Sequence, residues 1–434
     1  MAIGLDDLEA LVQRALSEGA KAAEVLAIRG SGWKIHLKPG GAPSESQTQR
    51  DELVVRVWVE GGRVGRMQGR FADGRELVGQ ALAATFESPE SAYAGPMASI
   101  GGLASGLGTF DRRYPNLTSE DRLEVVMDAE RQVRTAGSRF RSTGFRYEDE
   151  HTWRGLANSR GLLLEEPGTR YRLEGGVAGE GLSLRDHIET RAFASIASLP
   201  LGTNLARRGA ELMEDGKTLE PGPVRVVLPP LPVSRIIALL GEHFHPDRLT
   251  SGEFFLSPSE DGMPTISEQF HIVDDGSRPG ALHTRMFDDR GVPPVPLTLI
   301  REGRVDARFL DPETARRLDT RPTGHCWGDG LGPSNLLMRS GTRSLNALLT
   351  EIGGPSLMVD DLDPAGIDIR TGAFDMLVDG RVLEANVPVG AMRRVRLSGN
   401  LRDLLSNIVD VGNDTDRIGH VDAAGLIADG LILG

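Results

Sequence analysis

Three side chains of the types that commonly bind metal ions lie close together near the middle of the chain, as Glu242, His243 and His245. A zinc site uses at least three protein ligands, and two histidines on one helix can share the ion when they are four residues apart. His243 and His245 are two residues apart, which places them about 200° apart around an intact helix. An intact helix therefore cannot bring both imidazoles to one zinc ion.

The same residues allow two other arrangements that could hold a metal ion. If the helix ends early and residues 242–246 are extended, His243 and His245 would point to the same side of the chain. Alternatively, Glu242 and His245 would be neighbours on a helix, as ligands are in carboxylate-containing helical bundles. Each arrangement supplies only two ligands. The sequence therefore favours a structural role at a helix C-terminus, where histidine also interacts favourably with the helix dipole.

The surrounding sequence predicts how these residues are positioned. Residues 224–228 are mostly apolar and β-branched, with prolines on both sides, and predict a strand. Residues 233–245 predict a helix that ends before Pro246. Ile236, Ile237 and Leu240 recur at helical spacing and are the expected buried face. Glu242 and His243 would then face solvent or a chamber.

The only cysteine, Cys326, follows His325 directly. A cysteine and histidine can form a nucleophile and its base, but neighbours in sequence rarely orient in that way. A single cysteine is more often a small buried apolar residue. It also cannot form an intramolecular disulfide, which favours a reducing compartment.

Composition and charge exclude several classes of protein. The formal net charge of −13 argues against a nucleic-acid-binding protein, because binding phosphates needs clustered lysine and arginine. No apolar stretch approaches the roughly 20 residues that span a bilayer, and the start of the chain is acidic and amphipathic, without the features of a signal peptide. We therefore expect a cytoplasmic protein that binds neither nucleic acid nor membrane.

The pattern of elements predicts an α+β fold in two domains. An N-terminal helix–strands–helix domain is expected over residues 1–200, with a loop rich in Gly, Pro and Ser near 88–118. A larger, mainly antiparallel β domain with a few helices is expected over 201–434. Within the first domain, the patterns predict helices over 5–18, 74–86 and 118–136, and strands over 23–29, 33–37, 53–60, 140–148, 151–159, 162–166, 170–178 and 187–194.

Several phrases of the sequence resemble one known family. The segment 397–416, LSGNLRDLLSNIVDVGNDTD, resembles the C-terminal signature of the TldD/PmbA family, proteins related to zinc peptidases and long called modulators of DNA gyrase. The turns GGRVG at 61–65, LANSRG at 156–161 and DDRG at 288–291 are similar to turns of the same family. The TGH turn at 323–325 is similar to that of its partner-type subunit, called TldE or PmbA.

The resemblance implies which kind of subunit this chain is. The metal-bearing subunit, TldD, carries His-Glu-x-x-x-His on a helix after a strand equivalent to 224–228, and a cysteine ligand near its C-terminus. This chain lacks the motif and has His420 and Asp422, with no cysteine, near the second place. By resemblance it is a TldE/PmbA-like partner subunit without catalytic residues or a cofactor of its own. Zinc would lie in a TldD-like catalytic subunit.

The resemblance also implies the partners and leaves two alternatives open. The two subunits would form a heterodimer that processes or degrades unfolded or modified peptides. One alternative is a stand-alone metallopeptidase with a non-standard site at Glu242, His243 and His245. The other is a non-catalytic, peptide-binding homodimer.

Overall fold

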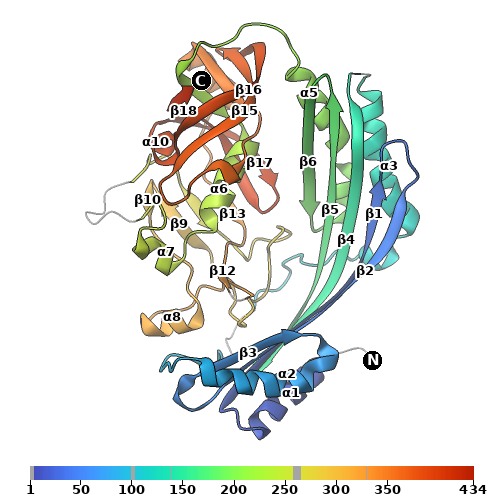
Figure 1. The fold of residues 1–434 in the computed structure, drawn as a ribbon, viewed down its shortest axis with the longest axis vertical. Helices are drawn as coiled ribbons and strands as arrows, with labels where there is room; N and C mark the ends of the chain where they lie inside the picture. The colour runs from blue at the N-terminus through green and yellow to red at the C-terminus, as the bar shows by residue number, and fades with distance from the viewer. Residues whose placement is uncertain (1–3, 99–102, 138, 258–264, 329) are drawn as a thin grey trace.

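The computed structural model describes residues 4–98, 103–137, 139–257, 265–328 and 330–434, which form two large β-sheets with helices (Figure 1). The first sheet is formed by the N-terminal half of the chain, and the second by the C-terminal half. The predicted α+β fold is thereby confirmed. The division at residue 200 stays a prediction. Residues 99–102 of the predicted loop 88–118 lie outside the described residues.

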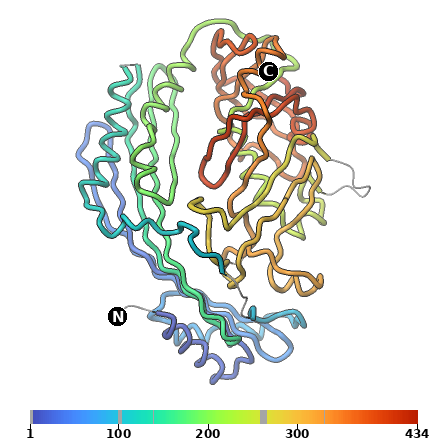
Figure 2. Tube along the Cα trace, turned by 180° about the vertical axis from the view of Figure 1, so that it is seen from behind, coloured from blue at the N-terminus to red at the C-terminus, as the bar shows by residue number. Residues whose placement is uncertain are grey.

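The first sheet has six strands in the order β3-β2-β1-β4-β5-β6, and every neighbouring pair is antiparallel. Figure 2 shows its long strands running between the two ends of this half of the molecule. The strands are β1 (Ala22–Leu37), β2 (Ser44–Trp58), β3 (Val64–Gly69), β4 (Arg141–Asn158), β5 (Leu163–Gly179) and β6 (Leu182–Thr190).

The prediction that β1, β4 and β5 would each be two shorter strands was wrong. In β1 the glycines at 30 and 32 lie between the two predicted strands and allow one strand to continue close beside β4. A β-carbon at Gly32 would lie only 1.9 Å from the carbonyl oxygen of Asp149. Glycine at this position therefore permits a close approach of two backbones rather than ending a strand.

Helices cover one face of the first sheet in two groups. The helices α1 (Leu5–Ser17) and α2 (Gly74–Ala84) pack on one end, where Val25 and Val55 are buried. The helices α3 (Ser119–Thr135), α4 (Phe193–Ser198) and α5 (Leu201–Glu211) pack on the other end, against Tyr147 and Tyr171. Side chains alternate between the faces of a strand, so the opposite face of the sheet is free to meet the C-terminal half. Figure 1 shows that arrangement, with α3 on the outer side.

The second sheet has ten strands, and β18 is at its centre, paired with β7, β13, β16 and β17. From β18 the sheet continues in the order β16, β15, β14 and β7. Because β7 also pairs with β18, these five strands close into a ring. Only β13–β18 and β7–β14 are parallel pairs among the described strands. The strands are β7 (Gly222–Leu228), β8 (Ile272–Asp274), β9 (Leu297–Arg301), β10 (Arg304–Val305), β13 (Leu336–Met338), β14 (Pro355–Val359), β15 (Ala373–Glu384), β16 (Val387–Asn400), β17 (Ile408–Ile418) and β18 (Val421–Leu433).

Short elements complete the C-terminal half. Its helices are α6 (Pro230–Gly241), α7 (Pro246–Ser251), α8 (Pro312–Arg317), α9 (Leu345–Ile352) and α10 (Leu401–Ser406), and β11 (Cys326–Trp327) pairs with β12 (Gly330–Leu331). Single 3-10 turns lie at Glu60–Gly62, Phe71–Asp73, Thr85–Glu87, Tyr114–Asn116 and Pro364–Gly366. None of the described helices is long and apolar enough to cross a membrane.

Candidate functional site

The helix α6 ends earlier than the sequence predicts. Its last residue is Gly241, and His245 is extended and caps the next helix, α7, which begins at Pro246. Glycine is a poor helix former and a residue before proline is disfavoured in the helical region, which explains the early end. The predicted buried face is confirmed, because Ile236, Ile237 and Leu240 are all buried.

The three candidate metal ligands face three different surroundings. Glu242 is exposed and lies close to Gly332, and the protein atoms around it raise the pKa of its carboxyl. The Nδ1 atom of His243 lies 2.8 Å from the carbonyl oxygen of Leu239, and its ring packs against Phe254. His245 packs edge-on against Phe309.

Burial lowers the pKa of both imidazoles, so each is neutral at neutral pH, the form that binds metals. In the part of the chain that the structure describes, no three His, Cys, Asp or Glu side chains are placed to hold one metal ion. His420 stacks on His283 with ring centroids 4.4 Å apart. Asp422 forms ion pairs with Arg278 and Arg417. Neither of these two residues adds a ligand to the end of α6.

Cys326 and His325 are both buried but have different partners. His325 Nε2 lies 2.8 Å from Asp274 Oδ1, and its ring stacks on Phe309. The Cys326 backbone N–H donates to Asp288, and burial raises the pKa of its thiol well above the usual value. A thiol that stays protonated is a weak nucleophile. Their surroundings therefore favour structural roles for both residues.

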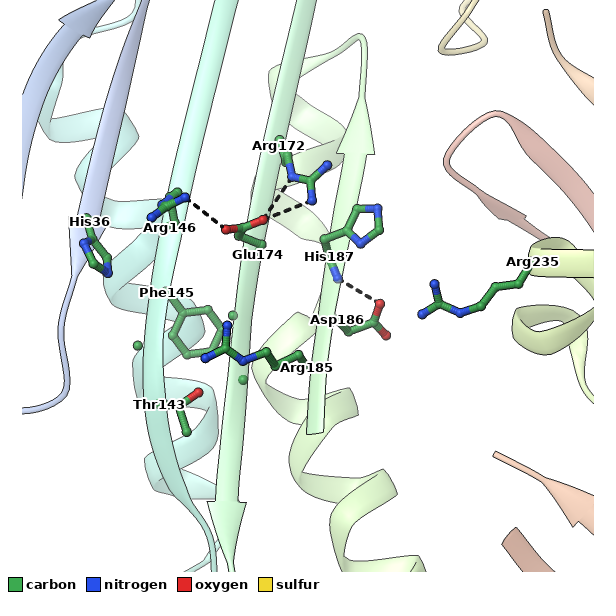
Figure 3. A pocket seen from close by; sticks show the side chains of 13 residues that line it. His36, Thr143, Phe145, Arg146, Arg172, Glu174, Arg185, Asp186, His187 and Arg235 are labelled. Atoms are coloured by element: carbon green, nitrogen blue, oxygen red, sulfur yellow. Dashed lines mark hydrogen bonds and ion pairs between the residues drawn. The ribbon is translucent and has the colours of Figure 1, made fainter. Parts of the chain in front are cut away.

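The inner face of the six-stranded sheet carries rows of alternating charge. A hollow of about 330 Å³ lies on this face (Figure 3). Glu174 on β5 accepts from Arg172 at 3.0 Å and lies 3.5 Å from Arg146 on β4. Arg235 reaches toward Asp186 from α6, across from the sheet, and is held there by Asp361. The next row across the strands is Lys34, Glu148, Arg172 and Glu189.

Three hollows follow one another along this face. The hollow of Figure 3 shares Arg146, Arg172 and Glu174 with a second hollow of about 640 Å³. The second shares further lining residues, Arg50 and Arg170 among them, with a third of about 360 Å³. Together they form a polar track along the inner face of the sheet, and residues of the C-terminal half border its two ends. We call this the sheet-face track.

The third hollow, which we call the arginine cavity, lies between the sheet and residues 282–285 and 327–328. Seven arginines and four carboxylates line it. Arg285 lies against the ring of Trp327, with its guanidinium carbon 3.4 Å from the ring centroid. His283 packs against the same Trp327. Burial lowers the pKa of His283 well below its usual value.

A set of buried ion pairs, which we call the docking network, joins the sheet to the C-terminal half at one wall of this cavity. Arg154 Nη1 donates to Glu166 at 2.7 Å, and Arg154 Nη2 donates to Asp289 at 2.5 Å. Glu166 also accepts from the backbone N–H of Met286. The members of the docking network are Glu24, Arg56, Arg154, Glu166, Asp289 and Arg290, in which Arg56 and Arg290 both donate to Glu24.

Sequence reasoning identified the turn 288–291 but missed the arginines of the cavity. Arg191 and Arg285 have no motif around them, and each resembles an ordinary surface arginine in the sequence. The strand pattern places Arg146, Arg172 and Lys34 on one face of the sheet, and this alternation was the available signal for the sheet-face track.

The comparisons with known proteins agree with this architecture. A model of the PmbA/TldA metallopeptidase C-terminal domain matches residues 221–433, and a model of the central domain matches 112–214. The metalloprotease PmbA of Escherichia coli O157:H7 is 24% identical over 97% of this chain and 94% of its own length. A PmbA homologue of Buchnera aphidicola is 26% identical over 38% of this chain and 34% of its own length.

A solved structure of TldE from Thermococcus kodakarensis shares the fold. Its TM-score is 0.82 at 16% identity, and the match covers 99% of this chain and 100% of that one. The two domain models together span most of this chain. The chain therefore belongs to the PmbA/TldD metallopeptidase family.

Proposed function

We propose that this chain is the TldE/PmbA-type partner subunit of a TldD/TldE-like zinc metallopeptidase that acts on unfolded or modified peptides in the cytoplasm. The observation that carries the proposal is the end of α6. There His243 and His245 have separate partners, Leu239 and Phe309, and no third ligand is placed beside them among the described residues. The relatives named PmbA and TldE support the same role.

The sheet-face track supports a peptide as the bound molecule. An extended peptide presents charged and polar groups on both sides, and the alternating rows of Lys34, Glu148 and Arg172 offer partners of either sign. The strand β6 is at one edge of the six-stranded sheet, and its Asp186 and His187 line the hollow of Figure 3. A peptide can add to such an edge as a further strand, which gives affinity without strict sequence requirements.

The test is to purify the chain alone and together with the TldD-like protein of the same organism. Alone, it should contain substoichiometric zinc and show no chelator-sensitive peptidase activity. Together, the two should form a heterodimer whose activity requires zinc bound by the TldD-like subunit. The His245→Ala variant should assemble and support activity within a few-fold of the unchanged chain.

Two results would favour the alternatives. Stoichiometric zinc in the chain alone, lost together with peptidase activity in His245→Ala, would establish a stand-alone metallopeptidase. A homodimer that binds peptides and forms no complex with the TldD-like protein would establish the non-catalytic alternative. A strictly monomeric mass with and without that protein would rule out the assembly that we propose.

A further inference from the structure

Arg285 carries a buried positive charge without a carboxylate in contact with it. Its side chain is 3% exposed. Nη1 donates to the carbonyl oxygen of Cys326 at 3.2 Å and Nη2 donates to that of Gly324 at 3.1 Å. Its Nε atom has no hydrogen-bond partner. No ion pair joins Arg285 to an acidic residue in the described parts of the chain.

Arg191, which also lines the cavity, has similar surroundings. It donates only to backbone carbonyl oxygens, of which that of Thr284 is nearest at 2.8 Å and those of Thr109 and Thr169 are at 3.3 Å. Part of its surface is open to the cavity, but protein atoms crowd the guanidinium. Burial lowers the pKa of Arg191 and of Arg285 to about 10, so both remain charged at neutral pH.

Seven arginines and only four carboxylates line the cavity, and this excess of positive charge favours the entry of an anion. Removing a charge from water is costly unless an opposite charge accompanies it. A guanidinium matches a carboxylate in shape and can donate two parallel hydrogen bonds to it. The cavity therefore offers a binding site for a carboxylate group.

The remaining walls indicate what carries that carboxylate. Leu26, Val54, Leu282 and Trp327 give the cavity an apolar side, and a volume of about 360 Å³ accommodates one or two amino-acid residues. The cavity is continuous with the sheet-face track, through lining residues that they share. A small inorganic anion would use the arginines but not the apolar wall or the track.

We propose that the arginine cavity binds a carboxylate of an extended peptide, with Arg285 and Arg191 as the opposing charges and Trp327 packing against the neighbouring part of the peptide. The carboxylate is either an aspartate or glutamate side chain or the C-terminus of the peptide. This inference rests on the proposed peptide-binding function and adds a preference for acidic peptides, which the chain should show without a catalytic partner.

The test uses the purified chain and three acetylated ten-residue peptides of glycine and serine. The first has a central aspartate and an amidated C-terminus, the second has asparagine and a free C-terminus, and the third has asparagine and an amidated C-terminus. At least one acid-bearing peptide should bind about tenfold more tightly than the third by calorimetry. The tighter of the first two identifies the source of the carboxylate.

The Arg285→Gln variant should bind all three peptides equally, because its amide can still donate hydrogen bonds but carries no charge. The matched control is Arg301→Gln, an exposed arginine on β9 that pairs with Asp306, and it should keep the preference. If Arg285→Gln does not fold, competition on the unchanged chain replaces it. There propionate should displace the acidic peptide, whereas propionamide should not.

Equal affinity of the unchanged chain for all three peptides, or a preference that survives in folded Arg285→Gln, would overturn the proposal. These outcomes are separate from the test of the proposed function, because neither reads peptidase activity. If the chain prefers acidic peptides but does not bind a TldD-like protein, this inference stands and the partner-subunit role is refuted. An active heterodimer that shows no preference for acidic peptides would support the partner-subunit role and refute this inference.

Discussion

The docking network forms part of the wall of the arginine cavity, and both bury arginines, but these arginines differ in the groups that they contact. In the docking network, burial opposes the charge of Arg154, yet the carboxylates of Asp289 and Glu166 outweigh it and raise its pKa. In the cavity, burial dominates and lowers the pKa of Arg285 to about 10. Burial alone therefore does not mark a binding site. The informative feature is a buried charge that no carboxylate contacts.

The largest effect is expected from removing the central cation of the docking network. Arg154→Ala would leave the carboxylates of Glu166 and Asp289 buried without their partner. Breaking a buried ion pair in this way costs about 3–5 kcal/mol of folding stability. Urea denaturation measures the loss. Arg139→Ala, which breaks an exposed pair with Glu180, is the control and should change the midpoint little. A similar loss in both variants would contradict the distinction.

A smaller effect on stability is expected from Arg285→Met. No carboxylate loses an ion-pair partner in this variant, and methionine fills much of the same space beside Trp327. Two carbonyl oxygens lose a donor, so we expect a change in the free energy of unfolding below about 2 kcal/mol. A loss as large as that of Arg154→Ala would show that Arg285 is structural, and would remove the comparison on which the cavity proposal depends.

Acidification should destabilise the cavity wall through His283. Its pKa is lowered from 6.5 in the folded chain, because burial and the nearby His420 disfavour the charged form. The unfolded chain therefore takes up a proton first as the pH falls below about 6.5, and stability falls by up to about 1.4 kcal/mol per pH unit for this one group.

The variant His283→Asn lacks this proton uptake. Relative to it, the unchanged chain should lose stability between pH 7 and pH 5, a window set by the usual histidine pKa of about 6.5. Denaturation curves at several pH values measure the difference. A gap between the two proteins that does not depend on pH would mean that His283 is not shielded as described.

The smallest effect is expected on the sheet-face track. Lys34 pairs with Glu148 at 3.2 Å, with about half of the lysine side chain exposed. Water screens such a pair, so Lys34→Gln should cost less than about 1 kcal/mol. Thermal unfolding measures the loss of stability in Lys34→Gln and in Arg154→Ala. A larger cost here than in the docking network would mean that burial is not what makes those pairs strong.

Much of the local structure could be predicted from the sequence, because it depends on neighbours along the chain. The buried face of α6, Ile236, Ile237 and Leu240, follows from helical spacing and is confirmed. The end of that helix was wrong by four residues, because Gly241 and Pro246 act together. The break predicted in β1 was wrong because Gly32 meets Asp149, which is distant in sequence.

The arginine cavity could not be predicted, for a related reason. Arg191 and Arg285 are about a hundred residues apart in the chain, and what makes them unusual is that each donates its hydrogen bonds to backbone carbonyl oxygens and not to a carboxylate. That property belongs to the packed structure and has no pattern in the sequence. Arg154 and Arg285 are the same residue type, and only the fold distinguishes them.

The position of β18 has a consequence for how the protein is made. This strand is the last of the described elements along the chain, yet four other strands pair with it and the ring of the C-terminal half closes through it. During synthesis on the ribosome, β7, β13, β16 and β17 emerge before β18. Until β18 emerges, the edges that pair with it remain unpaired. The six-stranded sheet contains no strand that pairs with β18, so it can form while translation continues. The C-terminal half should therefore depend most on chaperones that shield open sheet edges.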